Sequence, residues 1–525
     1  MKAAISAAFI QLEGAVRAVN RAVSPFFLLL VASCASVPGN APVPGSQTEE
    51  LPLLNRVTWG ANASSARELA RMGSARYLKA QLRPAEEAAL PPEAQALVDA
   101  MTITQRPLAE LARELESRRK AVDLLRNDDE KKAAQQAYQQ ELTRLGREAA
   151  ARMLLRALYS PWQLREQMAW FWMNHFNVFQ FKANLRVLVA DYEERAIRPH
   201  ALGRFRDLLG ATARHPAMLI YLDNAQNAAN RINENYAREL MELHTLGVDG
   251  GYTQRDVQEL ARILTGFGIN IDRETPNLRP AMRSQYVREG LFEFIPGRHD
   301  YGDKLLLGRA IRGRGAAEVD EALDLLARHP ATARFICRKL ALFFVSDDPS
   351  GALVEQLAAT FRSNDGDIAA VLRELFASAE FRGSLGTKFK DPVHYVVSAV
   401  RLAYDDKVIL NAGPMINWLG RMGEPLYARP TPDGFPLTRT EWASAGQMAT
   451  RFEIARTLGY GAAGLFRAEG PQPAERPAFP QLANALYYQS MQKTLAEPTR
   501  RTLDNATSPQ EWNMLLLASP DFMNR

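Results

Sequence analysis

The segment from Asn233 to Gly247 has the clearest two-sided pattern of polar and apolar positions in the chain. At about 100° per residue, this spacing predicts one helix that ends at the glycine. Its polar face would carry three carboxylates, two other polar groups and an arginine: Glu234, Asn235, Arg238, Glu239, Glu242 and Thr245. Because the flanking segments are apolar or structured, we expect this face to look into the protein. The alternative is a solvated face with an Arg238–Glu242 pair.

Helical periodicity dominates the chain from Leu54 onward and predicts a mainly α fold, with one large multi-helix domain over 54–525. Residues 107–156 are rich in alanine and charge, and they predict a helical hairpin with a break near Asn127. Residues 268–315 are irregular and rich in proline, glycine and arginine. We expect 292–294 and 305–307 to form a small β-hairpin within this insertion.

Residues 1–33 have the pattern of an export signal, with Lys2, Arg17 and Arg21 before a short apolar run. The run is shorter than the ~20 residues that a transmembrane helix needs. It ends at Cys34 in a sequence that resembles a bacterial lipobox, which predicts cleavage before Cys34 and acylation of its thiol. Residues 34–53 would then be a flexible Pro/Gly/Ser tether. We expect an exported outer-membrane lipoprotein, facing the periplasm or the surface and held by its lipid anchor; the alternative is an ordinary secretory signal with a coincidental cysteine.

Composition narrows the function classes only slightly. The chain has 525 residues, is 47% hydrophobic and carries a net charge of +5. No stripe of lysine and arginine with interleaved aromatics is present, so we expect no nucleic-acid partner. The two cysteines, Cys34 and Cys337, are too few for a disulfide framework or a thiolate zinc site.

Two further segments carry residue types suited to chemistry. The aromatic run 170–179 must be buried, and it takes Asn174 and His175 with it, so these polar groups need partners. Residues 298–304 place His299, Asp300 and Lys304 on a loop, a common way to present functional groups. The alternatives are a core histidine at 175 and a turn in which Asp300 caps its own backbone.

Several motifs occur together in a fixed order. They are Trp172-x-Asn174-His175-Phe176, the run 233–243, Tyr252-Thr253, Asp256-Val257, Leu264-Thr265-Gly266-Phe267, His299-Asp300 and 329–333. With the opening 54–60 and the closing 517–522, they resemble the bacterial domain-of-unknown-function 1800 (DUF1800) family. Two departures are Phe267, where tryptophan is expected, and 107–156, which reads as an insertion.

This resemblance implies an exported, largely helical protein with no established activity. It also implies that position 244 varies between histidine and phenylalanine, which argues against a metal role for His244. Members of the family often appear beside a second exported family that resembles alkaline phosphatases and sulfatases, so a protein of that kind is a candidate partner.

Two function classes stay open. No nucleophile elbow, phosphate-binding loop or zincin motif is present in the sequence. The first hypothesis is a hydrolase of an envelope or extracellular polymer, which works by acid/base chemistry or with a divalent metal. Its catalytic candidates are Glu234, Glu239, Glu242, His175 and Arg238; its binding candidates are Asn174, Asn235, His299, Asp300 and Lys304; its metal candidates are His175, Glu239, Glu242 and His299. The second hypothesis is a non-catalytic scaffold or binding protein that partners the sulfatase-like protein, with the same glutamates in a buried polar network.

Overall fold

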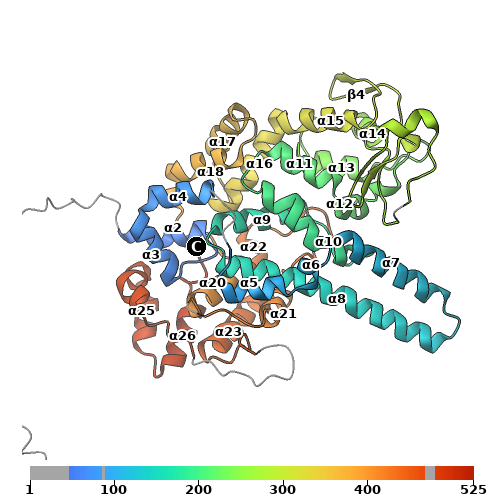
Figure 1. The fold of residues 1–525 in the computed structure, drawn as a ribbon. Helices are drawn as coiled ribbons and strands as arrows, with labels where there is room; N and C mark the ends of the chain where they lie inside the picture. Colours follow the sequence, from blue (N-terminus) through green and yellow to red (C-terminus); the bar gives the residue numbers. More distant parts are fainter. Residues whose placement is uncertain (1–46, 85–88, 273, 406, 468–478) are drawn as a thin grey trace, which may run out of the picture. The chain divides into compact units, whose positions relative to one another are not determined.

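Helices make up most of the chain in the computed structural model (Figure 1), which confirms the predicted mainly α fold. The structure describes residues 47–84, 89–272, 274–405, 407–467 and 479–525. The proposed signal, Cys34 and most of the tether lie outside the described residues. Among the helices that are described, none is both long and apolar enough to cross a membrane.

The first described segment is a series of short helices, and the Trp59 that follows its first helix is fully buried against the ring of His394. These helices are α2 (Gln47–Val57), α3 (Ala63–Met72), α4 (Ser74–Leu82), α5 (Pro92–Asp99) and α6 (Thr102–Gln105). Helix α3 begins at a capping box, in which the Asn62 side chain accepts from the Ser65 backbone N–H and the Ser65 hydroxyl oxygen accepts from the Asn62 backbone N–H.

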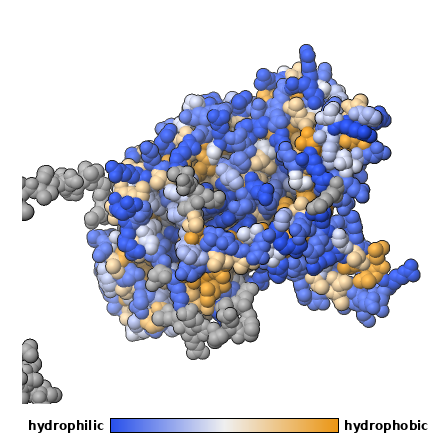
Figure 2. All heavy atoms as spheres, in the orientation of Figure 1, coloured by the Kyte–Doolittle hydropathy of each residue, from blue (hydrophilic) through white to orange (hydrophobic). Residues whose placement is uncertain are grey.

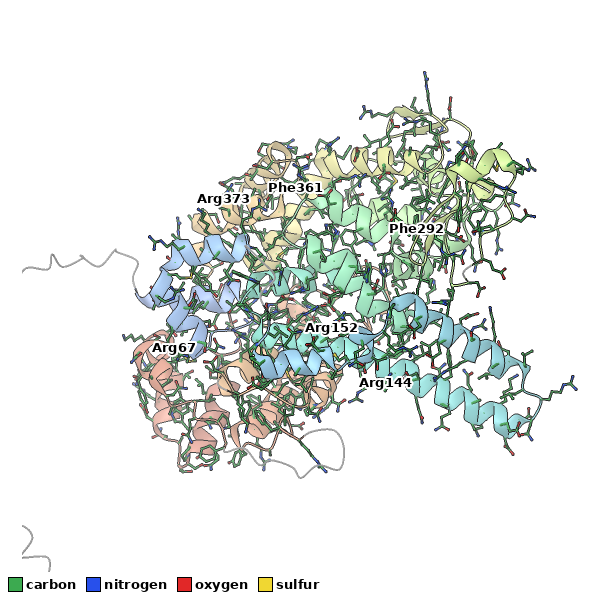
Figure 3. All side chains as sticks on the ribbon, in the orientation of Figure 1. Arg67, Arg144, Arg152, Phe292, Phe361 and Arg373 are labelled. Atoms are coloured by element: carbon green, nitrogen blue, oxygen red, sulfur yellow. The ribbon has the colours of Figure 1, made fainter. Side chains whose placement is uncertain are left out.

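The charged segment forms two helices that pack side by side, α7 (Leu108–Leu124) and α8 (Asp128–Tyr159) (Figure 1). The Asn127 side chain caps α8 by accepting from two backbone N–H groups, and three acidic residues follow in the first turn, where the helix dipole favours them. Two arginines on α8 mark the change from solvent to core (Figure 3): the Arg144 side chain is 43% exposed, whereas that of Arg152 is 5% exposed.

The middle of the chain holds the aromatic segment and the helices around it. It contains α9 (Gln163–His175), α10 (Leu185–Asp191), a π-helical segment (Tyr192–Ile197), α11 (Phe205–Arg214), α12 (Pro216–Tyr221), α13 (Asn235–Glu242) and α14 (Gln254–Ile263), with short 3₁₀ turns at Arg198–His200 and Asn224–Gln226. Helix α9 is buried almost all round, as its aromatic content predicts.

Two His-Pro-Ala segments each begin a helix. In α12, the ring Nδ1 of His215 accepts from the backbone of Ala217, 3.1 Å away. In α16 (Pro330–Phe344), the Nδ1 of His329 accepts from Ala331 at 3.2 Å. Proline suits the first helical position, so each histidine acts as an N-cap and the 329–333 motif is a helix start.

Short strands fill the insertion between α14 and α15 (Ala317–Arg328). A three-stranded antiparallel sheet has the order β1 (Phe267–Ile269), β3 (Phe292–Phe294), β2 (Val287–Glu289), and a second sheet pairs β4 (Lys304–Leu306) with β5 (Arg309–Ile311). The predicted pairing of 292–294 with 305–307 is therefore wrong. Each segment pairs with a close neighbour instead, because Gly290 and the Leu307-Gly308 pair have positive φ and allow tight turns.

Helices resume after the strands and complete the fold. They are α17 (Gly351–Ser363), α18 (Ile368–Ala377), α19 (Ala379–Gly383), α20 (Pro392–Ala403), α21 (Gly413–Arg421), α22 (Arg439–Trp442), α23 (Ala445–Gly459), α24 (Gln492–Thr494), α25 (Glu497–Asp504) and α26 (Pro509–Ala518), with a π turn at Tyr487–Met491 and 3₁₀ turns at Pro280–Gln285 and Pro296–Arg298. Helices α23 and α26 pack closely together. One hydrophobic cluster includes residues from Leu51 to Met523, so a single core supports the helices of 46–525.

Candidate functional site

Helix α13 is shorter than the sequence pattern predicts. It ends at Glu242 because the main-chain oxygen of Glu239 accepts from both Leu243, at 2.9 Å, and His244, at 3.0 Å, which breaks the regular ladder. The chain then turns through Gly247, where φ is +85°. Thr245, predicted on the polar face, is instead buried and donates to the oxygen of Leu240 at 2.6 Å.

The polar face of α13 has two parts. Its first turn faces water, where Glu234 pairs with Arg238 at 3.2 Å and accepts from Gln254 at 2.6 Å, while Asn235 donates to the oxygen of Leu222. The alternative pair Arg238–Glu242 does not form. The side chains of Glu234 and Arg238 are 33% and 40% exposed. The expectation that the whole polar face is hidden from water is therefore wrong for this half of the helix.

The second half of the face lies beside a loop from a distant part of the chain. Glu239 is half-buried, and burial raises the pKa of its carboxyl, with further contributions from Glu242 and Asp433. Glu242 accepts from the hydroxyl of Tyr252 at 3.4 Å. Asp433 therefore lies close enough to Glu239 for the two carboxylates to interact electrostatically, although 194 positions separate them in the sequence.

Two asparagines at the end of α9 hold this loop, which spans 429–435. Asn174 makes a reciprocal pair with the backbone of Phe435: its Oδ1 accepts at 2.5 Å and its Nδ2 donates at 2.8 Å. The Nδ2 of Asn177 donates to the oxygens of Arg429, at 3.0 Å, and Thr431, at 2.8 Å. The buried amides of the aromatic segment thus find their partners in the loop that carries Asp433.

The loop approaches α9 so closely that only glycine fits at 434. Gly434 has φ +77°, and a Cβ there would lie 2.1 Å from the main-chain oxygen of Asn174. Asp433, next to it, accepts from the hydroxyl of Thr431 at 2.5 Å and from Arg429 at 3.2 Å. These hydrogen bonds outweigh partial burial, which would raise the pKa, and hold the pKa of Asp433 below its usual range.

His175 and Lys339 form the inner side of the site. The Nε2 of His175 lies 3.1 Å from the oxygen of His244, so this nitrogen donates and Nδ1 is left to accept from the Nζ of Lys339 at 3.0 Å. Burial holds the pKa of His175 well below its usual value, so the ring is neutral. Burial also lowers the pKa of Lys339 to about 8, while Asp433 acts in the opposite direction.

The His244 ring, unlike the main-chain oxygen of that residue, makes no polar contact in this arrangement. It is fully buried, and neither ring nitrogen has a hydrogen-bond partner among the described residues. Its ring packs against those of Phe176 and His175, 5.0 and 6.1 Å away.

The other three candidates, His299, Asp300 and Lys304, form a separate network. The Nε2 of His299 and the Nζ of Lys304 lie 2.9 and 2.5 Å from the two carboxylate oxygens of Glu318, and all three of these side chains are fully buried. Asp300 pairs with Arg262 at 2.8 Å. These contacts fasten the β4 region to α15, and within the described part of the chain none of the three side chains has a hydrogen bond or ion pair with Glu239.

The metal candidates do not converge either. His175 is bonded to Lys339, and His299 to Glu318. Across the described ranges, no three His, Cys, Asp or Glu side chains are grouped so that they could hold a metal ion.

Sequence reasoning missed Lys339 and Asp433. The one available signal for Asp433 was Pro432-Asp433-Gly434, in which a proline before Asp-Gly predicts a tight turn. Lys339 lies on a helix with mixed charge and apolar positions, and nothing in its spacing distinguishes it from a surface lysine.

The comparisons with known proteins match the chain to one family, whose description gives no function. A family model described as "Protein of unknown function (DUF1800)" matches residues 52–524. No curated protein and no solved structure matches the chain.

Proposed function

The chain belongs to the DUF1800 family, whose description assigns no activity, and we propose that it is an acid/base hydrolase of an envelope or extracellular glycan. Glu239 would be the general acid and Asp433 the second carboxylate. The observation that carries the proposal is the clamp of Asn174 and Asn177, which holds Asp433 in electrostatic range of Glu239 and Lys339.

Glycoside hydrolysis requires two carboxyl groups, one protonated and one ionised. One carboxylic acid gives its proton to the leaving oxygen, while a carboxylate on the other side of the sugar activates water or attacks the anomeric carbon. Burial raises the pKa of Glu239, and hydrogen bonds lower that of Asp433. Two carboxyls with oppositely shifted pKa values are the pattern expected of such an acid and its partner.

Lys339 would serve as a positioning residue for this pair. Its protonated amine would favour the anionic form of Asp433, and the neutral Nδ1 of His175 fixes where the amine lies. The metal-assisted version has less support, because the described carboxylates and histidines form no cluster of three.

The test is a hydrolysis assay of the purified protein against a panel of polysaccharides. We expect Glu239→Gln and Asp433→Asn each to lower the rate about 10²- to 10⁴-fold, the usual contribution of acid–base groups. Glu441→Gln, an exposed glutamate on α22, is the matched control and should leave the rate unchanged. With an aryl glycoside whose leaving group needs no proton, Glu239→Gln should lose much less activity in the bond-cleaving step. Unaltered polymer hydrolysis in both variants would refute the assignment.

We also propose that the protein is exported and anchored in the outer membrane through an acylated Cys34. The support is the sequence of 1–34, with its basic start, short apolar run and final cysteine. Incorporation of labelled palmitate by the natural chain, and its loss in Cys34→Ser, tests this anchor.

A scaffold role is the second candidate function, and one observation favours it. Leu124, at the end of α7, is 82% exposed, and hydrophobic surface is visible on the α7–α8 hairpin in Figure 2. Exposed apolar groups on a protruding element are typical of a partner contact. A sulfatase- or phosphatase-like exported protein is the partner that this proposal names, and a pull-down from membrane extracts tests it.

A further inference from the structure

A cavity of about 520 Å³ lies away from the candidate site. Its walls come from α2, α20, α24 to α26 and the segments 385–390 and 520–524, and none of Glu239, Asp433 or Lys339 lines it. Its larger apolar side chains include Leu51, Leu402, Met491, Leu495, Leu516 and Phe522. This volume is within the usual range for a small-molecule site. Polar residues share the lining with these apolar side chains, and two of them are charged, Lys390 and Asp521.

One buried amine lines the cavity. Lys390 is 2% exposed, and its Nζ lies 3.7 Å from the centre of the Phe522 ring. Among the described residues, no hydrogen bond or ion pair engages this Nζ. Lysine is rarely buried without a paired charge, because an unpaired ammonium loses its hydration.

The residues around Lys390 do not supply the missing anion. The neighbouring carboxylate of Asp391 is bonded to His394, with Oδ2 2.7 Å from the ring Nδ1 and Oδ1 accepting from the backbone at 2.8 Å. Burial, with the nearby cations of Arg451 and Arg525, holds the pKa of Lys390 well below its usual value. The local field therefore favours a negative group beside the amine.

The acidic residue that lines the same cavity is already engaged. Asp521 accepts from the backbone of Ala496 at 3.0 Å and from the hydroxyl of Thr499, which ties α25 to the segment after α26. Its oxygens are thus used within the wall, and Lys390 is left as the charged group available to an occupant.

We propose that this cavity binds a monoanionic amphiphile, a long-chain carboxylate, with its head on the Nζ of Lys390 and its alkyl chain along the leucine and methionine wall. Binding of the carboxylate would be accompanied by uptake of one proton from solvent onto the Lys390 amine, and the resulting ammonium and carboxylate would form a charge-assisted hydrogen bond. Phe522 would keep its contact with the amine from the other side. The apolar wall provides the hydrophobic part of the affinity, and the single amine selects the charged head.

Dodecanoate and dodecanol, used below their aggregation concentrations, are the probes. They share one alkyl chain and differ in the head group. With the full-length purified protein, calorimetry should give dodecanoate about 10- to 100-fold tighter binding than dodecanol, the usual value of one hydrogen bond to a charged group. In Lys390→Met this preference should disappear while dodecanol still binds. Lys131→Met, an exposed lysine on α8, should keep the preference.

A labelling experiment on the natural chain avoids any dependence on the folding of a variant. A dodecanoate with a diazirine near its methyl end should label peptides that contain Met491, Leu495 or Leu516, and free dodecanoate should compete. Equal binding of the acid and the alcohol, an unchanged preference in Lys390→Met, or labelling only outside these peptides would each overturn the proposal.

Discussion

Replacing Glu318 by glutamine is expected to lower the free energy of unfolding by about 3–5 kcal/mol, the usual cost of removing one partner from a buried ion pair. The carboxylate of Glu318 lies between His299 and Lys304 with all three side chains fully buried. It also accepts from the backbones of Arg314, at 2.6 Å, and Gly315, at 2.9 Å. An amide of the same shape would leave the ammonium of Lys304 without an anion at a fully buried position.

Chemical denaturation followed by circular dichroism measures this change. The matched control is Glu321→Gln on the same helix, because Glu321 pairs with Arg314 at the surface, where the two side chains are 42% and 56% exposed. An exposed ion pair contributes at most about 1 kcal/mol. Equal losses in the two variants would show that burial of the Glu318 network does not add to its contribution.

Replacing Gly434 by alanine is expected to be nearly as damaging, with a loss of about 2–5 kcal/mol from positive φ and steric overlap together. The backbone has φ +77°, and the new Cβ would lie 2.1 Å from the oxygen of Asn174. The loop would have to leave the end of α9, and Asp433 would move with it. Polymer hydrolysis should therefore fall together with the free energy of unfolding.

Gly308→Ala separates the two causes of this loss. Gly308 has φ +78°, but no atom lies within 4 Å of where an added Cβ would be. Alanine there would therefore strain the backbone without a steric overlap. We expect a loss of about 1–2 kcal/mol and no effect on hydrolysis. A Gly434→Ala variant that matches Gly308→Ala in both measurements would contradict the close approach of the loop to α9.

More of the fold than of the candidate site could be predicted from the sequence. Helical periodicity and the density of aromatics around Trp172 predict a mainly α fold with a buried α9, because both are local properties. The end of α13 was mispredicted because the split hydrogen bond at Glu239 depends on how His244 packs. The spacing of polar and apolar residues along the chain carries no information about how His244 packs against distant residues.

The candidate site was predicted only in part for the same reason. The sequence predicts that Asn174 and His175 need partners and that Glu239 is a candidate catalytic carboxylate. The residues that the structure places beside them, Phe435, Lys339 and Asp433, come from distant segments. His299 was assigned to the site because a His-Asp pair on a loop suggests chemistry. Its true partner, Glu318, lies 19 positions further along in α15, where it reads as an ordinary first-turn acid.

The pH dependence of polymer hydrolysis tests the acid/base assignment most directly. Glu239 must be protonated to act, so the rate should fall as pH rises through its raised pKa; Asp433 must be ionised, so the rate should fall as pH drops through its lowered pKa. We predict a bell-shaped kcat/KM profile for the natural protein and, in the residual activity of Glu239→Gln, loss of the alkaline decline set by Glu239, so that any remaining decline lies near pH 8, where Lys339 loses its proton. An alkaline decline that persists unchanged in Glu239→Gln would contradict the account.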